Sequence, residues 1–82
     1  MRIQVLGPGC PKCKRLAANA EEALKQAGVE AEIEKVTSVA DIAKFGVMFT
    51  PGLAIDGKVV SAGKIPDVSQ IVSWIMNAQA QS

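Results

Sequence analysis

The sequence predicts a single α/β domain whose elements follow the order β-α-β-α-β-β-α. Three observations support this prediction: a long amphipathic helix pattern lies between two strand patterns, an Asp-Gly pair joins two further strand patterns, and a last helix pattern follows. A crossover helix between the first two strands makes them parallel, whereas a hairpin adds an antiparallel pair. The predicted sheet is therefore mixed. The chain has 82 residues, which is the size of one small domain.

The first half of the chain contains the patterns of a strand, a long helix and a second strand. Residues 2–6 are mostly apolar, as in a strand. In residues 11–27 the apolar side chains recur with the period of a helix that buries one face. Pro11 suits the first position of that helix, and Gly28 suits a left-handed stop. Residues 29–36 alternate between apolar side chains and glutamates, which predicts a strand with one face in water.

The second half contains the patterns of a short helix and a hairpin. A Ser-x-x-Asp capping pattern that begins at Ser38 predicts a short helix, and Gly46 ends it. Residues 53–55 and 58–60 are predicted strands. The Asp-Gly pair between them favours a type I′ hairpin turn, because both of its residues need a positive φ.

The last predicted element is a helix that begins after Asp67, where an Asp-x-x-Gln pattern forms a second capping box. This helix is predicted to run to about Asn77. The Ala-Gln tail that follows, residues 78–82, is expected to fray.

Composition argues against several classes of function. The formal net charge is +1 and there is no histidine. A nearly neutral chain attracts nucleic acid weakly, and without histidine neither Cys-His nor Ser-His chemistry is available. No apolar run approaches the roughly 18 residues of a membrane span, and the first residues are typical of a strand rather than a signal peptide. We therefore expect a cytoplasmic monomer that binds neither nucleic acid nor membrane.

Cys10 and Cys13 are the candidate reactive residues. They lie where the first strand passes into the first helix, and a helix start presents unpaired N–H groups and the positive end of the dipole. Both effects favour a thiolate at Cys10, and Lys12 adds positive charge, so we predict a lowered pKa for the Cys10 thiol. Pro11 offers no N–H group, and Gly9 leaves the approach to the Cys10 sulfur open. Cys10 is therefore the expected attacking thiolate.

Cys13 lies one helical turn further on and is expected to be partly buried. This spacing lets it close a short disulfide ring with Cys10, or attack a mixed disulfide there and release a reduced product. An inert pair of buried cysteines is an alternative interpretation. A closed zinc site would need four ligands, and the chain offers no second cysteine pair. We expect no metal, and no cofactor beyond this disulfide, because no dinucleotide-binding glycine loop is present.

Taken together, these features resemble the thioredoxin superfamily, and most closely its smallest branch, the glutaredoxin-sized thioredoxins also called redox-active disulfide proteins. The resemblance covers essentially the whole chain and rests on Cys10-Pro11-Lys12-Cys13 after a short strand, Thr50-Pro51 before a later strand, the Asp56-Gly57 hairpin and the closing helix. It implies one thioredoxin-like domain over residues 1–82, with a four-stranded sheet and helices on both faces.

The resemblance also implies roles for individual residues. Cys10 would be the nucleophile and Cys13 the resolving cysteine. Pro51 would be a cis proline packed beside the disulfide, and Thr50 would offer its backbone to an extended substrate segment. The implied activity is thiol–disulfide exchange with protein substrates.

The chain departs from its larger relatives at several positions. Larger thioredoxins have a buried Asp six residues before the first cysteine, where this chain has Gln4, which cannot take a proton. Proton transfer from Cys13 would then use water or a flanking group such as Lys12. Gly9 stands where those proteins have a Trp. Residues 62–67 only partly resemble the segment that holds glutathione in glutaredoxins, which speaks against glutathione use.

The leading hypothesis is a cytoplasmic thiol–disulfide oxidoreductase that reduces partner proteins and is recycled by an external enzyme similar to thioredoxin reductase. A soft-metal carrier is one alternative, since two thiolates suit Cu(I). Such carriers end in a strand, however, and have a Met where this chain has Pro8. A docking module switched by its disulfide is the other alternative, and it differs only in turnover.

Overall fold

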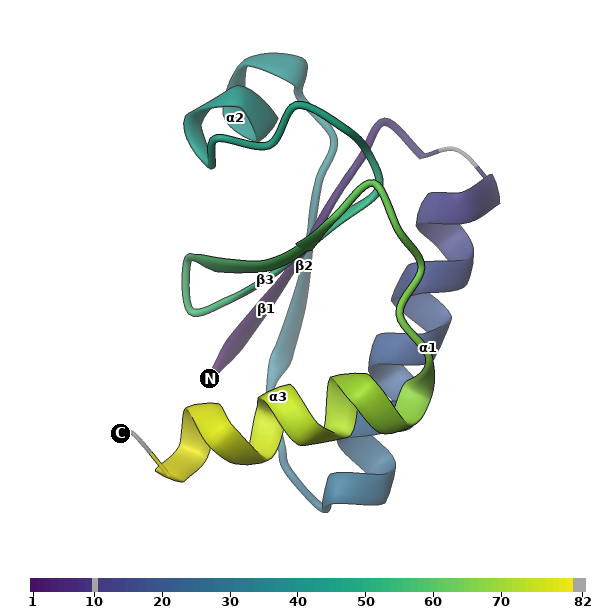
Figure 1. Ribbon diagram of the computed structural model, residues 1–82, viewed down its shortest axis with the longest axis vertical. Helices are drawn as coiled ribbons and strands as arrows, with labels where there is room; N and C mark the ends of the chain where they lie inside the picture. Colours follow the sequence, from purple (N-terminus) through teal and green to yellow (C-terminus); the bar gives the residue numbers. More distant parts are fainter. Residues whose placement is uncertain (10, 81–82) are drawn as a thin grey trace.

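Figure 1 shows a computed structural model of the protein, which describes residues 1–9 and 11–80. The order of its elements is the predicted β-α-β-α-β-β-α. These elements are β1 (Arg2–Leu6), α1 (Pro11–Ala27), β2 (Glu32–Val36), α2 (Val39–Lys44), β3 (Gly52–Ile55), β4 (Lys58–Ala62) and α3 (Val68–Ala80).

The four strands form one mixed sheet in the order β2-β1-β3-β4. β1 is parallel to β2 and antiparallel to β3, and β3 is antiparallel to β4. The register aligns Leu6 with Val36 and with Gly52, and it aligns Gly52 with Ala62. These four residues mark one end of the sheet, which we call the Cys13 end because α1 begins there. The opposite end, where β1 begins, is called the Arg2 end.

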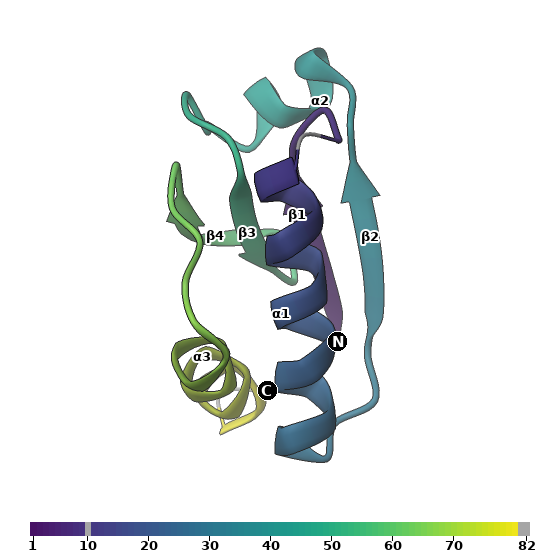
Figure 2. The same ribbon diagram turned by 90° about the vertical axis from the view of Figure 1, so that its right-hand side faces the viewer.

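Helices cover both faces of the sheet, as predicted. α1 and α3 pack against each other on one face, and Figure 2 looks onto α1 with the strands behind it. The main core lies under these two helices and includes Ile3, Val5, Leu16, Leu53, Ile71 and Ile75. A smaller core lies on the other face under α2, at the Cys13 end, and consists of Leu6, Val36, Ile42 and Val47. The mixed α/β prediction is confirmed.

Helix α1 stops where the sequence predicted, but β2 begins later than predicted. Gly28 has a φ of +67°, and its N–H donates to the Lys25 carbonyl over 3.2 Å. The N–H of Val29 donates to the Leu24 carbonyl over 3.1 Å, which completes the helix stop. Because that N–H is used by the helix, the strand starts at Glu32 instead of residue 29.

Helix α3 is longer than predicted. It runs to Ala80, so the expected frayed tail is wrong for residues 78–80, and residues 81–82 lie outside the described residues. The reason is packing, since Ala78 continues the inner stripe of Ile71 and Ile75 and contacts the main core. Alanine also has the highest helix propensity, which favours extension.

The two predicted capping boxes differ in outcome. The Asp67 carboxylate accepts a hydrogen bond from the Gln70 N–H over 2.9 Å, which caps α3. At α2 the Ser38 side chain makes no capping hydrogen bond, so that part of the prediction is wrong. Only the Ser38 carbonyl takes part, accepting from the Ile42 N–H over 2.9 Å.

The predicted hairpin turn joins β3 to β4. Asp56 and Gly57 have φ values of +51° and +83°, as a type I′ turn requires. The Asp56 carboxylate also accepts a hydrogen bond from the Arg2 N–H over 2.8 Å, which joins the turn to the start of β1. Within residues 1–9 and 11–80, no helix is long and apolar enough to cross a membrane.

Candidate active site

The predicted site residues come together at the Cys13 end of the sheet. Residues 7–9 follow β1 there, Thr50 and Pro51 precede β3, and Gly63 follows β4. The register of the four strands brings these separate segments to one edge, and α1 begins at the same edge (Figure 1). Cys10 lies outside the described residues, so its predicted position is not described.

Cys13 occupies the first turn of α1 and is 5% exposed. Its sulfur lies directly against Gly7, because a β-carbon built on Gly7 would overlap Cys13 Sγ and lie 3.3 Å from Cys13 Cβ. Gly7 cannot easily retreat, since its N–H donates to the Val36 carbonyl over 2.9 Å and extends the ladder between β1 and β2. The close approach of Cys13 to the end of β1 therefore requires a glycine at position 7.

A small cavity of about 90 Å³ borders Cys13. Two basic residues, Lys14 and Lys35, line it together with the hydroxyl-bearing Thr37. The other lining residues are Val5, Gly7, Gly9 and Ala17. The cavity therefore brings two basic side chains next to a buried cysteine.

Pro51 lies beside the contact between Gly7 and Cys13. The Pro51 Cα is 3.9 Å from the β-carbon built on Gly7, and Pro51 itself is fully buried. The Thr50–Pro51 peptide bond is cis, the form that the resemblance implied. The Pro51 carbonyl accepts a hydrogen bond from the Gly63 N–H over 2.8 Å, which fixes the segment next to β4.

The remaining predicted site residues are exposed at the same end of the sheet. They are Gly9, Pro11, Lys12 and Thr50. Gly9 has a φ of +93°, a region that residues with a β-carbon rarely adopt. Its glycine is thus explained by the backbone conformation of the turn between β1 and α1.

An apolar surface adjoins Thr50. Met48 is 89% exposed and Phe49 is 70% exposed, although their neighbour Val47 is buried in the smaller core. Phe49 lies over Gly63, where an added β-carbon would be 3.0 Å from Phe49 Cβ. Exposed apolar side chains next to a reactive centre are typical of a surface that contacts other proteins.

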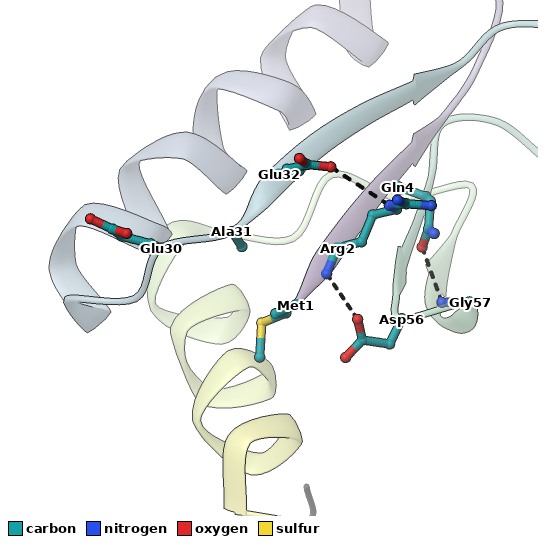
Figure 3. A pocket seen from close by; sticks show the side chains of 8 residues that line it. All are labelled: Met1, Arg2, Gln4, Glu30, Ala31, Glu32, Asp56 and Gly57. Carbon is teal, nitrogen blue, oxygen red and sulfur yellow. Dashed lines mark hydrogen bonds and ion pairs between the residues drawn. The ribbon is translucent and has the colours of Figure 1, made fainter.

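Gln4 lies away from the cysteine site. It is 7% exposed, and its side-chain oxygen accepts a hydrogen bond from the Gly57 N–H over 3.1 Å. Figure 3 shows Gln4 in an open hollow at the Arg2 end, whereas the next residue, Val5, lines the cavity beside Cys13. Adjacent residues of a strand face opposite sides of a sheet. Gln4 therefore supports the hairpin turn and does not contact the Cys13 cavity.

The sequence analysis missed Lys35 and Thr37 as neighbours of Cys13. They lie at and just after the end of β2, far from Cys13 in the chain, and only the parallel pairing of β1 with β2 brings them close. Their position could have been predicted, because two adjacent parallel strands end on the same side of a sheet, and the residues that end β2 therefore lie near those that follow β1.

Comparison with known proteins agrees with this arrangement. A family model described as a thioredoxin domain matches residues 1–76 of the chain. The chain belongs to the thioredoxin family. A thioredoxin of Methanocaldococcus jannaschii is 46% identical over 69 residues, which cover 84% of this chain and 79% of that protein. A thioredoxin of Methanothermobacter thermautotrophicus is 39% identical over 71 residues, which cover 87% of this chain and 92% of that protein.

Membership of the thioredoxin family makes this chain a small thioredoxin-like redox protein. Both thioredoxins named above are matched over most of their length, so the likeness extends over the domain and not only over the cysteine motif.

Proposed function

We propose that this thioredoxin-like protein reduces disulfides in partner proteins through a dithiol centre formed by Cys10 and Cys13. The observation that carries the proposal is the buried Cys13 sulfur, which lies against Gly7 at the start of α1 and beside Pro51. The role of Cys10 rests on its place in the sequence, three residues before Cys13 and directly before the first residue of α1.

The first step is attack by the Cys10 thiolate on one sulfur of the partner disulfide. A bond forms between Cys10 and that sulfur, the partner S–S bond breaks, and the second partner sulfur leaves as a thiolate that takes up a proton. The product is a mixed disulfide. Thr50 is exposed next to the buried Pro51, so its backbone is the proposed contact for an extended partner segment.

The second step is attack by Cys13 on the Cys10 sulfur. The Cys13 thiol loses its proton, a Cys10–Cys13 disulfide forms, the bond between Cys10 and the first partner sulfur breaks, and that first partner sulfur leaves and is protonated. The partner gains two electrons and two protons, and this protein loses the same number. The cavity lined by Lys14 and Lys35 is the proposed route for the Cys13 proton, since Gln4 lies on the other face of the sheet.

The oxidised protein must then be reduced by an outside donor. We propose an external reductase similar to thioredoxin reductase, which supplies two electrons per cycle, in the cytoplasm. The disulfide itself is the redox group, so the proposal calls for no other cofactor and no metal, and for a monomer that acts without nucleic acid or membrane.

The soft-metal carrier is a weaker candidate. Small carriers of that type end in a strand, whereas the last element of the described residues here is helix α3. A module that only switches a partner interface remains the alternative that shares the site, and turnover separates it from the proposal.

A redox titration tests the proposal. The protein is equilibrated in graded thiol–disulfide buffers, and the free thiols are counted by alkylation and mass measurement. We expect a reversible two-electron midpoint between about −180 and −270 mV, where exchange proteins of this type fall. Failure to form the intramolecular disulfide, or a midpoint well below about −300 mV, would contradict the proposal.

Two matched serine variants refine the test. Cys13→Ser should react with a disulfide substrate and stop as a mixed disulfide, because the resolving thiol is missing. Cys10→Ser should not form that intermediate, because Cys13 is buried. Turnover of insulin disulfides with an added reductant then separates the oxidoreductase from the redox-switched docking module, which would form the disulfide without turning over.

A further inference from the structure

Charge is divided unevenly between the two ends of the molecule. Of the 9 basic residues in the chain, six lie at the Cys13 end, whereas of the 8 acidic residues Asp41 lies there and Glu34 and Asp67 border it, lining hollows with Lys44 and with Lys64 respectively. The six basic residues are Lys12, Lys14, Arg15, Lys35, Lys44 and Lys64. Basic residues thus outnumber acidic ones at this end by six to three, although the net charge of the chain is only +1.

The structure places these six residues around the cysteine site. Three of them lie in the first turns of α1, and Lys35 is the next-to-last residue of β2. Lys44 ends α2, which packs on Leu6 and Val36 at that end of the sheet. Lys64 follows Gly63, whose N–H is bonded to the Pro51 carbonyl. The basic residues thus come from four separate segments that the fold brings together.

Five of the acidic residues lie away from the Cys13 end, and Asp67 and Glu34 lie at its border. Asp67 is the cap of α3, and the carbonyl before it, that of Pro66, accepts a hydrogen bond from Asn19 in the middle of α1. Glu34 is paired with Arg2. Among the basic residues, Lys25 lies outside the Cys13 end. It is about 20 Å further along α1 than Lys12, because a helix rises about 1.5 Å per residue.

Ion pairing does not neutralise the basic residues at the Cys13 end. Among residues 1–9 and 11–80, the ion pairs are those of Arg2 with Glu32 and Glu34 and that of Lys44 with Asp41. The other basic side chains of this end are exposed to solvent. Their charge is therefore available to an approaching partner.

We infer that the Cys13 end binds protein segments in which acidic residues flank the disulfide. This inference rests on the proposed function and adds the charge of the partner to it. Exposed charges of one sign around a reactive site raise the local concentration of oppositely charged ligands and speed their association by roughly 10- to 1,000-fold at low salt. The same charges slow the approach of basic segments, so the surface selects among disulfides of equal redox potential.

The test uses three small alkyl disulfides as probes: dithiodipropionate, which is a dianion, hydroxyethyl disulfide, which is neutral, and cystamine, which is a dication. Oxidation of the reduced protein is followed by acid quench, alkylation and mass measurement. Ionic strength is varied between 0.01 M, where charges act over about 30 Å, and 1 M, where they act over about 3 Å. Added salt should slow the reaction with the dianion and accelerate the reaction with the dication.

Two double variants locate the effect. Arg15→Glu with Lys64→Glu reverses two charges at the Cys13 end, and Lys25→Glu with Lys58→Glu makes the same net change elsewhere, all four residues being exposed. At low salt, the first variant should lower the ratio of dianion rate to dication rate by about tenfold, the low end of the range for electrostatic steering. The second variant should change this ratio by no more than about twofold, because screening weakens distant charges. Thermal unfolding of both variants checks that they are folded.

Two other outcomes are possible, and they contradict different proposals. Equal effects of the two double variants, or similar rates with all three disulfides at every ionic strength, would overturn the charge preference and leave the proposed function intact. Absence of reaction with all three disulfides would overturn the proposed function and this inference with it.

Discussion

At the Arg2 end of the sheet the charged groups are paired with one another, whereas among the described basic residues of the Cys13 end only Lys44 forms an ion pair, with Asp41. Arg2 forms ion pairs with Glu32 and Glu34, and its backbone N–H binds Asp56. Figure 3 shows Arg2, Glu32 and Asp56 around an open hollow, with Gln4 bonded to Gly57 of the hairpin turn. At the Cys13 end, exposed lysines and the exposed apolar side chains of Met48 and Phe49 surround a buried thiol.

The size of a hollow is therefore a poor guide to the proposed site in this molecule. The hollow at the Arg2 end is much larger than the cavity beside Cys13, at about 840 Å³ against about 90 Å³. Arg2, Gln4, Glu32 and Asp56 in its lining are hydrogen-bonded or ion-paired, so they contribute to stability. The smaller cavity borders the sulfur of Cys13, which is proposed to react, and exposed basic side chains lie around it.

The largest effects are expected from glycine substitutions, one at each end of the sheet. Gly7→Ala places a methyl group where Cys13 Sγ lies, so the sulfur must rotate away from its position. A misplacement of about 1 Å at a reacting atom can lower a rate on the order of 100-fold. We therefore expect resolution of the mixed disulfide to slow by about that factor, measured by rapid quench of the product thiol. An unchanged rate would mean that the Gly7–Cys13 contact does not position the sulfur.

The matching change at the Arg2 end is Gly57→Ala. Gly57 has a φ of +83°, and a β-carbon added there would meet no atom within 4 Å beyond its chain neighbours, so the cost of the methyl group is backbone strain. A residue with a β-carbon in the left-handed region costs about 1–2 kcal/mol. Urea unfolding should show this loss of stability while the rate of disulfide exchange stays the same. A large fall in the exchange rate would show that the two ends are coupled.

Gln4→Ala tests the role assigned to Gln4. The variant removes the hydrogen bond to the Gly57 N–H, which water can replace at the exposed turn, so about 1 kcal/mol of stability should be lost. The pH profile of disulfide exchange should be the same as in the unmodified protein, because Gln4 does not line the Cys13 cavity. A shifted profile would place Gln4 in the proton transfer after all.

Arg2→Ala should have a smaller effect. Its ion pairs with Glu32 and Glu34 span 3.9 Å and 3.5 Å between exposed side chains, and such pairs contribute roughly 0–1 kcal/mol. The difference in unfolding free energy from the unmodified protein should shrink further in 1 M salt. A loss that persists in high salt would indicate packing by the Arg2 side chain instead of charge.

The smallest effect on stability is expected at Phe49, on the Cys13 end. Its side chain is 70% exposed, so Phe49→Ser should change the unfolding free energy by less than about 0.5 kcal/mol. Val47→Ser, two residues earlier, removes a buried member of the smaller core and should lower stability by clearly more. Equal losses in the two variants would show that Phe49 belongs to the core.

Local signals were sufficient to predict several elements. Both ends of α1 followed from the sequence, because Pro11 and Gly28 act through restrictions of their own backbone. The Asp56-Gly57 turn followed in the same way, since its positive φ values are a property of those two residues. Wherever a residue's own conformational preference decides, sequence reasoning is adequate.

Elements decided by distant contacts were predicted less well. The start of β2 depends on whether the Val29 N–H bonds to the helix or to a strand, and the alternation of side chains cannot tell these apart. The end of α3 depends on the contact of Ala78 with the main core. Val29 and Ala78 both follow the expected apolar pattern. The pattern therefore predicts that they pack against the core, but it does not predict which backbone hydrogen bonds form.

The candidate site shows the same division. The cysteine motif and Thr50-Pro51 could be found because they are contiguous in the sequence. The proximity of Lys35 to Cys13 could not, because it depends on the register between β1 and β2. Likewise, the alternation along β1 places Gln4 and Val5 on opposite faces of the sheet, but it does not predict which of the two faces is covered by α1.

The burial of Cys13 has a consequence for observing how the molecule opens. With 5% exposure, its thiol is accessible to an alkylating reagent only when the first turn of α1 separates from the end of β1. In a Cys10→Ser variant, the rate of alkylation under native conditions therefore reports local unfolding of the β1–α1 unit. Trp74, on α3, reports separation of the other helix. The sulfur that is proposed to take part in disulfide exchange is thus also a natural probe of local unfolding around it.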